Sequence, residues 1–323
     1  MAGGFEIKGY PEKSWSISKM KTIDNCFREY YYTYYGSHNG WIYESTDEQK
    51  IAWRLKKLTN IYLMFGDKLH IVIKKIIENN TNEEKIINIK DYMRSILNMG
   101  VKSSVEKLRT GEWDEYPKGE MLQEYYYGDK LEKETIDQIK ERINLCIDNF
   151  FKCKTYNEIK LGTTTILEVD EGKFDFIFIS GVKVFALIDA LYIDKEGNYV
   201  IVDWKTGKVG EFDRDQVLVY ALYVMEKYNV PLEKIKGRVE YLLSEENIEY
   251  KFTSEDIEYI KNKVQQDLNV INAFLIDKEL NIPRDKEYFI KSDNLKKCRK
   301  CKFRKMCLGE EYINEVNRHS STN

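Results

Sequence analysis

Several features that mark large protein classes are scarce or missing in this sequence. It has only four prolines, and no stretch of about 18 consecutive apolar residues, the length that crosses a membrane as a helix. Its start, MAGGFEIKGYPEKSW, lacks the apolar segment of a secretory signal. The phosphate-binding pattern G-x-x-x-x-G-K-[ST] does not occur either. We therefore expect a cytoplasmic protein that does not span a membrane and has no helicase motif of this kind.

An excess of positive charge is also absent, since the formal net charge is −3. Net charge thus gives no sign of a nucleic-acid partner, and any basic patch has to be local. One such patch exists, because seven of the ten residues from Lys296 to Lys305 are Lys or Arg. With 33% charged and 42% hydrophobic residues over 323 positions, the chain has the composition and length of a globular protein with a sizeable core.

The first half of the chain has helical periodicity. A helix capped by Ser16 or Ser18 is predicted to run through Cys26 into a tyrosine-rich stretch. The pattern predicts further helices over 48–78, 82–109 and 130–152, with a loop over 111–129. The clustered tyrosines are interpreted as packing residues, with stacking on nucleobases as an alternative; they are Tyr30, Tyr31, Tyr32, Tyr34 and Tyr35.

After Leu161 the periodicity becomes that of β-strands. The segments TTTILEVDE, KFDFIFIS, VKVFALIDALYI and NYVIVDWKT are predicted as four consecutive strands. The later elements are predicted as a helix over 213–228, strands over 236–243 and 247–252, and a helix over 254–276 capped by Thr253 or Ser254. This order predicts an α/β fold, in which a sheet follows a large helical section.

The stretch from Phe185 to Lys208 carries the clearest chemical signal. Interpreted as a hairpin, it places Asp189 on one strand, with Asp203 and Lys205 on one face of the next, because alternate residues of a strand share a face. Carboxylates are typical ligands of magnesium or manganese, and a lysine beside such a metal can orient water or stabilise charge on a phosphate. Solvated side chains at strand ends remain the alternative interpretation.

Six cysteines in an apparently cytosolic protein favour metal or cluster ligation over disulfides. Cys298, Cys301 and Cys307 follow the spacing C-x₂-C-x₅-C. A zinc ion or an iron–sulfur cluster needs four ligands, and Cys26, near the other end of the chain, is the best candidate for the fourth. The remaining two cysteines lack ligand spacing and are expected to be buried thiols.

Six segments together resemble the RecB-like nucleases of the PD-(D/E)XK superfamily. The branch they resemble carries an iron–sulfur cluster and includes the AddB helicase–nuclease subunit and the CRISPR adaptation nucleases. In chain order, the segments are SISKMKTIDNC, GDKLH, the strand that ends at Asp189, VDWKTG, QVLVY and the three spaced cysteines. One departure is Ala186, which stands where the family often has glycine.

The resemblance implies roles for individual residues. The implied ligands of Mg²⁺ or Mn²⁺ are His70, Asp189, Asp203 and the carbonyl of Trp204. The implied catalytic residues are Lys205, Asp189, Asp203, Gln216 and Tyr220, of which the last two would line the groove and position the strand or the lysine. The implied ligands of a [4Fe–4S] cluster, with Zn²⁺ as the alternative, are Cys26, Cys298, Cys301 and Cys307.

The resemblance also implies a fold, a division of the chain and a function. The fold would be a restriction-endonuclease-like mixed sheet flanked by helices. Its parts would be an N-terminal helical part of the nuclease core (1–70), a helical insertion (71–160), the sheet core (161–290) and a cysteine segment (291–323). The function would be metal-dependent DNA cleavage, in particular as an exonuclease on single strands or DNA ends, in repair, recombination or CRISPR-type processing. A helicase or CRISPR integrase would be the partner, and any unwinding would fall to it.

Two alternatives remain at this level. The chain could be a catalytically inactive DNA-binding scaffold of a helicase–nuclease complex, because a protein can keep a fold without keeping its catalytic activity. It could also be a zinc-stapled interaction module. The length favours a general RecB-like exonuclease over the compact CRISPR adaptation form, while cleavage polarity and strand preference have no signature in the residues.

Overall fold

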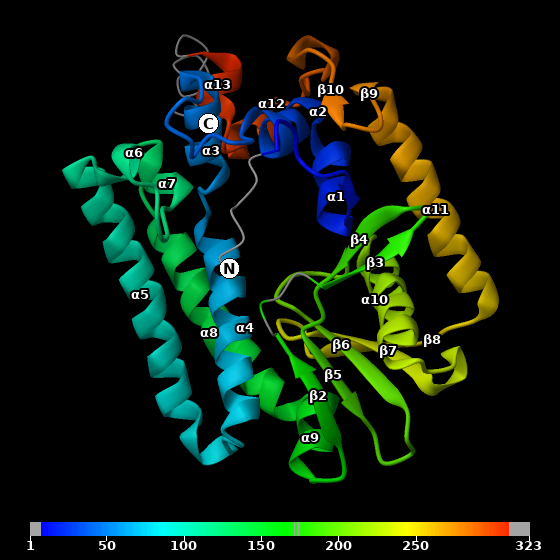
Figure 1. The fold of residues 1–323 in the computed structure, drawn as a ribbon. Helices are drawn as coiled ribbons and strands as arrows, with labels where there is room; N and C mark the ends of the chain where they lie inside the picture. The colour runs from blue at the N-terminus through cyan, green and yellow to red at the C-terminus, as the bar shows by residue number, and fades with distance from the viewer. Residues whose placement is uncertain (1–7, 171, 173–174, 310–323) are drawn as a thin grey trace, which may run out of the picture.

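The long helices of the first half and the sheet of the second half stand side by side, and the first and last described helices lie together above them (Figure 1). The computed structural model describes residues 8–170, 172 and 175–309. It confirms a mixed α/β fold with a sheet flanked by helices. Among the described residues, no helix is long and apolar enough to cross a membrane.

The N-terminal segment contains short helices. They are β1 (Ser14–Trp15), α1 (Ile17–Asn25), α2 (Phe27–Tyr31), a π-helical turn (Tyr32–Gly36) and α3 (Asp47–Lys56). Ser16 caps α1, because its hydroxyl accepts from the backbone N–H of Lys19 at 3.2 Å. The prediction that this helix runs through Cys26 is wrong: Cys26 is extended, with φ −168° and ψ 124°. The break frees its thiol from the helix and directs it to the pocket described below.

A bundle of long helices follows. It consists of α4 (Ile61–Glu78), α5 (Ile86–Thr110) and α8 (Lys133–Lys152), with the shorter α6 (Glu112–Glu115), α7 (Gln123–Tyr126) and α9 (Lys154–Lys160). The single helix predicted over 48–78 is wrong. The chain breaks before α4, where the Asn60 side chain accepts from the N–H groups of Tyr62 and Leu63 at 3.0 and 2.9 Å. The cap provides an acceptor for backbone N–H groups at the start of α4, which have no partner within the helix.

The central sheet has five strands in the order β2-β5-β6-β7-β8. They are β2 (Thr165–Val169), β5 (Ala190–Ile193), β6 (Tyr199–Lys205), β7 (Ile235–Tyr241) and β8 (Glu246–Lys251). Strands β6 and β7 are parallel, and the other neighbours are antiparallel. Helix α10 (Asp213–Tyr228) connects β6 to β7 and packs on one face, while the bundle covers the other. The predicted bounds of α10 are confirmed.

The segment VKVFALIDALYI is two strands, so its prediction as one strand is wrong. Its first part is β4 (Val182–Ala186), which pairs with β1 and β3 (Asp175–Ile179) in a separate three-stranded sheet. Its second part is β5 of the central sheet. Both parts are equally apolar, so periodicity does not reveal the break. Asp189 consequently lies in the crossing between the sheets, where its carbonyl accepts from the N–H of Asp170 at 2.9 Å.

The C-terminal segment returns to the N-terminal helices. It comprises α11 (Ser254–Ala273), β9 (Leu275–Asp277), β10 (Ile282–Pro283), α12 (Leu295–Lys300) and α13 (Arg304–Leu308). Three short 3₁₀ turns complete the chain at Glu83–Lys85, Leu232–Lys234 and Lys286–Tyr288. Thr253 caps α11 as predicted: its hydroxyl accepts from the N–H of Asp256 at 3.3 Å, and the Asp256 carboxylate accepts from the N–H of Thr253 at 3.1 Å. Phe289, fully buried, packs against Tyr30 and Tyr31 and so joins the two ends of the chain.

Two cysteines were expected to be buried thiols. Cys146 on α8 is fully buried, as expected. Cys153 is only half-buried, which corrects the expectation. Its sulfur accepts from the N–H of Tyr156 at 3.4 Å and caps α9, because a sulfur at a helix start can satisfy a backbone donor that has no partner within the helix.

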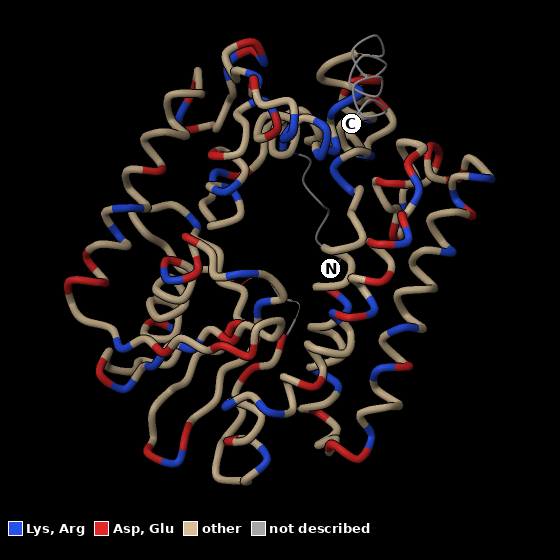
Figure 2. The backbone as a smooth tube through the Cα atoms, turned by 180° about the vertical axis from the view of Figure 1, so that it is seen from behind, with Lys and Arg blue, Asp and Glu red and all other residues tan. Residues whose placement is uncertain are grey.

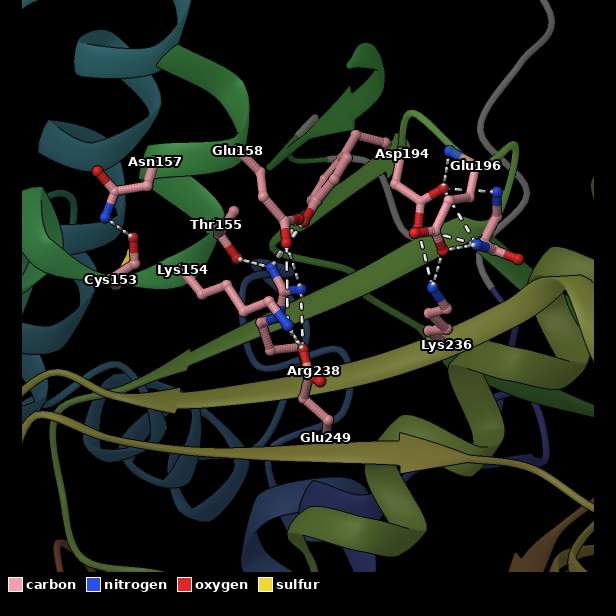
Figure 3. Close-up of polar contacts among 12 residues, drawn as sticks. Cys153, Lys154, Thr155, Asn157, Glu158, Asp194, Glu196, Lys236, Arg238 and Glu249 are labelled. Atoms are coloured by element: carbon pink, nitrogen blue, oxygen red, sulfur yellow. Dashed lines mark hydrogen bonds and ion pairs between the residues drawn. The ribbon is translucent and has the colours of Figure 1, made fainter. Parts of the chain in front are cut away.

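The face of the sheet toward α9 is held by the buried Arg238 of β7 (Figure 3). Its Nη1 donates to the Tyr192 hydroxyl at 2.7 Å and to the Thr155 hydroxyl at 3.0 Å. Its Nη2 pairs with carboxylates of Glu158 and Glu249 at 3.1 and 2.9 Å. Burying a guanidinium is tolerated when its donors are satisfied in this way. The network therefore fixes α9 on the sheet.

Candidate active site and cysteine pocket

Residues from four elements meet at the end of β6. Helix α4 contributes His70, and the crossing before β5 contributes Asp189. Strand β6 ends with Asp203 and Lys205, which share the face toward α10. Helix α10 contributes Gln216, whose side chain contacts the lysine. The structure thus brings together the residues that the sequence selected from separate segments.

Asp189 joins α4 to β6. Its Oδ1 lies 3.1 Å from His70 Nδ1, and its Oδ2 accepts from the backbone N–H of Trp204 at 2.7 Å. The Trp204 side chain points to the opposite face, where its indole N–H donates to Glu240 at 2.9 Å. The tryptophan therefore anchors the strand on one face while its neighbours face the site.

A chain of polar contacts runs from β6 into α10. Lys205 Nζ lies 2.7 Å from Asp203 Oδ2 and donates to Gln216 Oε1 at 3.0 Å. The amide of Gln216 donates in turn to the Tyr220 hydroxyl at 2.7 Å. Gln216 and Tyr220 are four residues apart on one face of the helix. Lys205 is thus held between a carboxylate and an amide that a buried tyrosine orients.

The two carboxylates of the site are incompletely compensated. Burial, followed by repulsion from Asp189, raises the pKa of Asp203 to about 6, although Lys205 opposes the shift. Attraction to Asp189 raises the pKa of His70 to about 9, against the effect of burial. Burial alone would lower the pKa of Lys205, but Asp203 raises it above its usual value. At neutral pH both His70 and Lys205 are therefore cations beside the two aspartates.

The donor set fits a hard divalent cation. Carboxylate oxygens and an imidazole nitrogen are common ligands of Mg²⁺ and Mn²⁺. The mutual repulsion of Asp189 and Asp203 is a second indication, since a divalent ion between them would relieve it. No three His, Cys, Asp or Glu side chains in the described part of the chain already stand in a metal-binding arrangement. Instead, His70 pairs with the carboxylate of Asp189, and Lys205 pairs with the carboxylate of Asp203.

Three residues near the site were given no role from the sequence, although Gly66 and Lys21 lie in two of the segments that resemble the family. Arg142 of α8 donates to the carbonyl of Thr206 at 2.7 Å and so fixes the loop after Lys205. Gly66 of α4 faces the same loop, since a Cβ there would lie 3.6 Å from the Thr206 hydroxyl. Burial lowers the pKa of Lys21 of α1, and Lys205 is near enough to lower it further. Arg142 lies outside the matching segments, so only its proximity in the fold identifies it.

The four cysteines that were selected as one ligand set line one pocket. Cys26 comes from the break between α1 and α2, and the other three come from α12, its C-terminal end and α13. Burial raises the pKa values of Cys298, Cys301 and Cys307, and neighbouring thiols of the set raise each of them further. Thiolates this close repel one another, so the pocket fits a cation that binds sulfur.

The surroundings of the pocket are positively charged. Lys291 donates to the carbonyl of Cys307 at 2.8 Å, and Lys297 donates to the carbonyl of Asn25 at 3.3 Å. Arg28 also lines the pocket and donates to the carbonyl of Phe289 at 2.9 Å. These contacts hold the two ends of the chain together without a metal. Zinc and an iron–sulfur cluster are both groups that four thiols can bind.

Comparison with known proteins gives one family. A family model described as the PD-(D/E)XK nuclease superfamily matches residues 14–308. The matched span runs from β1 to α13 and contains every residue of the candidate active site and of the cysteine pocket. A search of curated proteins finds no match.

Proposed function

The chain belongs to the PD-(D/E)XK nuclease superfamily, and on that premise we propose that it is an active nuclease that hydrolyses phosphodiester bonds in DNA with Mg²⁺ or Mn²⁺. One observation carries the proposal. His70, Asp189 and Asp203 converge beside Lys205, although they come from three separate segments. An intact set of ligands and a cation is expected of an active site and has no purpose in a scaffold.

The metal would be held by His70, Asp189, Asp203 and the Trp204 carbonyl. When bound, such a metal lowers the pKa of a coordinated water and offsets charge on the scissile phosphate. Asp203 is buried and fixed at the end of β6, so it contributes a ligand that needs little reorganisation. His70 would release its proton to become a ligand, since a metal binds the neutral imidazole.

Lys205 supplies the positive charge on the protein side. Its raised pKa keeps it protonated at neutral pH, so it can donate to the attacking water or to a phosphate oxygen as negative charge develops. Gln216 holds the ammonium group at 3.0 Å, and Tyr220 holds Gln216. These two residues act through the lysine and are positioning residues in this proposal.

The cysteine pocket would hold a [4Fe–4S] cluster, with Zn²⁺ as the alternative. Its four thiols come from both ends of the chain, so a bound cluster would close a loop of almost the whole protein and stabilise it. We assign it a structural role, because no second redox group is apparent in the sequence. Brown colour with broad absorbance near about 400 nm would favour the cluster.

The finer features of the function are proposals drawn from the family resemblance. The preferred substrate would be single-stranded DNA or DNA ends, cut as an exonuclease during repair, recombination or CRISPR-type processing. A helicase or a CRISPR integrase would be the partner, in the cytoplasm. We likewise propose the division of the chain at 70, 160 and 290, with residues 71–160 as a helical insertion that shapes access to the site.

The test is cleavage of end-labelled single- and double-stranded DNA with Mg²⁺ or Mn²⁺. Lys205→Ala should lower the cleavage rate more than about a hundredfold while leaving the fold and DNA affinity intact. Lys208→Ala is the matched control, since Lys208 is an exposed lysine three positions further along. Equal cleavage by the wild type and Lys205→Ala would reject the assigned site. No cleavage by a folded, metal-loaded wild type would favour the scaffold.

A further inference from the structure

Four side chains between the active site and the cysteine pocket form a row that the mechanism above does not use. We call this row the α1 path; its members are Lys21, Tyr34, Lys56 and Lys302. They come from α1, the π-helical turn, α3 and the segment between α12 and α13, which lie together at the top of Figure 1. Each is at least partly exposed, so each is available to a ligand.

Lys21 begins the path at the active site. Its Nζ lies 5.7 Å from the centre of the Phe212 ring, just before the start of α10. Burial and the charge of Lys205 lower its pKa, whereas Asp213 and Asp203 raise it. Lys21 is therefore within electrostatic reach of the residues that would hold the metal, and a phosphate beside it would be close to the scissile bond.

Tyr34 lies in the middle of the path. Its hydroxyl lies against Ser18 and Thr22 on the polar face of α1. The ammonium groups of Lys19 and Lys56 lie 4.9 and 5.8 Å from the centre of its ring. A partly exposed aromatic ring with two cations near it can stack on a base while the cations bind the flanking phosphates.

Lys56 and Lys302 continue the path to the cysteine pocket. Lys302 Nζ donates to the carbonyl of Lys56 at 2.8 Å, and Lys302 follows the pocket residue Cys301. Burial lowers the pKa of Lys56, and Lys302 lowers it further. Lys56 is nevertheless exposed at the surface.

The lysines of the path are only partly offset by carboxylates, because Asp203 and Asp213 act on Lys21, and Glu29 on Lys302, without forming an ion pair. In the part of the chain that the structure describes, no carboxylate lies within the 4.0 Å ion-pair distance of Lys21, Lys56 or Lys302. Glu29 is the carboxylate that most affects Lys302, whose pKa it raises against the effect of burial. Figure 2 shows basic residues gathered where the C-terminal segment meets the N-terminal helices. A row of cations that form no ion pair attracts a polyanion.

We propose that the α1 path binds the single-stranded part of a nucleic acid between the active site and the cysteine pocket. Phosphates would lie at Lys21, Lys56 and Lys302, and one base would stack on Tyr34. The strand is single because a base must be unpaired to stack on a tyrosine ring. This inference rests on the proposed nuclease function and adds the route of its substrate.

The test measures binding of a fluorescent oligothymidylate of about 20 nucleotides to full-length Lys205→Ala protein, by anisotropy at several salt concentrations. Lys56→Ala and Lys302→Ala should each weaken binding about fivefold, and the double variant should reduce the salt slope by about 1.4. Lys195→Ala is the matched control, an exposed lysine in the turn before β6. Thermal unfolding checks that each variant folds, and Lys56→Gln replaces any Lys56→Ala protein that does not.

Tyr34 tests the stacking contact separately. Tyr34→Leu should weaken binding at least about fivefold, whereas Tyr34→Phe keeps the ring and should bind as the parent does. A duplex of the same sequence should compete poorly. Equal competition by the duplex, or unchanged binding by Tyr34→Leu, would overturn the stacking contact.

The outcomes separate the two proposals. If the parent protein binds the oligonucleotide and the Lys56/Lys302 double variant binds it equally at every salt concentration, the α1 path is wrong and the nuclease proposal stands. If the folded parent protein binds no nucleic acid at all, both are wrong.

Discussion

Positively charged side chains pair with carboxylates in one region of the molecule and form no ion pairs in another. On the face of the sheet toward α9, Arg238 lies between Glu158 and Glu249, and Lys236 pairs with Asp194 at 3.0 Å. Along α1, by contrast, lysines stand beside one another and beside aromatic rings. Paired charge contributes to holding elements together, and unpaired charge costs stability unless a ligand uses it. The comparison separates a structural region from a functional one.

The largest effect is expected in the paired region. Arg238→Leu should lower the free energy of unfolding by about 3 kcal/mol, because it leaves the buried hydroxyls of Tyr192 and Thr155 and the partly exposed carboxylate of Glu158 without their partner. Chemical denaturation of the folded variant measures this. Cleavage per folded molecule should be unchanged, and a loss of cleavage with intact stability would contradict the separation of the two regions. Lys195→Ala serves again as the control.

The cysteine pocket should respond to loss of one ligand. Cys298→Ser should abolish stoichiometric iron or zinc binding and lower the melting temperature, because the remaining thiols no longer close the loop between the chain ends. Metal analysis and calorimetry measure both quantities. Cys146→Ser is the comparison, since Cys146 is buried far from the pocket in sequence and should leave metal content unchanged. A Cys298→Ser protein that folds, binds DNA and retains its metal, yet fails to cleave, would contradict a structural role.

The positioning of Lys205 predicts an intermediate effect. Gln216→Leu should reduce the cleavage rate about tenfold, because the ammonium group loses a contact at 3.0 Å that orients it. The affinity for DNA should not change, which distinguishes orientation of the lysine from a contact with the strand. Gln216→Glu keeps an acceptor and should restore part of the rate. An equal loss in both variants would indicate a different role for this side chain.

The smallest effect concerns Lys19, which lies beside Lys56 and the Tyr34 ring. Burial and then Lys56 lower its pKa to about 8. Below pH 8 the Lys19 ammonium group is charged in both the folded and the unfolded state, and its burial lowers the free energy of unfolding. Between pH 8 and the unfolded pKa near 10.5, the folded state has lost this proton while the unfolded state keeps it, so the free energy of unfolding rises with pH. The difference between wild type and Lys19→Met should change by about 1 kcal/mol over that range. A flat difference would show that Lys19 is not desolvated.

Much of the fold was readable from periodicity and caps. The bounds of α10, the cap of α11 by Thr253 and the bundle helices followed from local patterns that neighbouring residues control. The breaks at Cys26, before α4 and between β4 and β5 did not, because the segments on both sides have the same pattern. Each break sets the position of a residue in the candidate active site or the cysteine pocket. The wrong predictions of helix and strand bounds therefore lie near functional residues.

The candidate site was partly readable as well. The sequence marked Asp189, Asp203 and Lys205 through their place at strand ends, and the spaced cysteines through their density. Their roles remain predictions. Arg142 carried no mark, because an arginine on a helix surface is a common residue and only its neighbours give it a role. Thr206 and Lys21 lie in matching segments, but only their contacts in the fold connect them to the site.

The sequence by itself determined which groups are available for chemistry: a carboxylate and a lysine two residues apart on one strand face, a histidine on a helix, and thiols at both chain ends. Which groups are available depends on the residue types and on their spacing within short segments of the chain. The tertiary structure decided which charges are compensated. Arg238 meets its carboxylates, whereas Lys56 and Lys302 meet each other. That difference depends on contacts between distant segments, and desolvation and Coulomb interactions are set by those contacts.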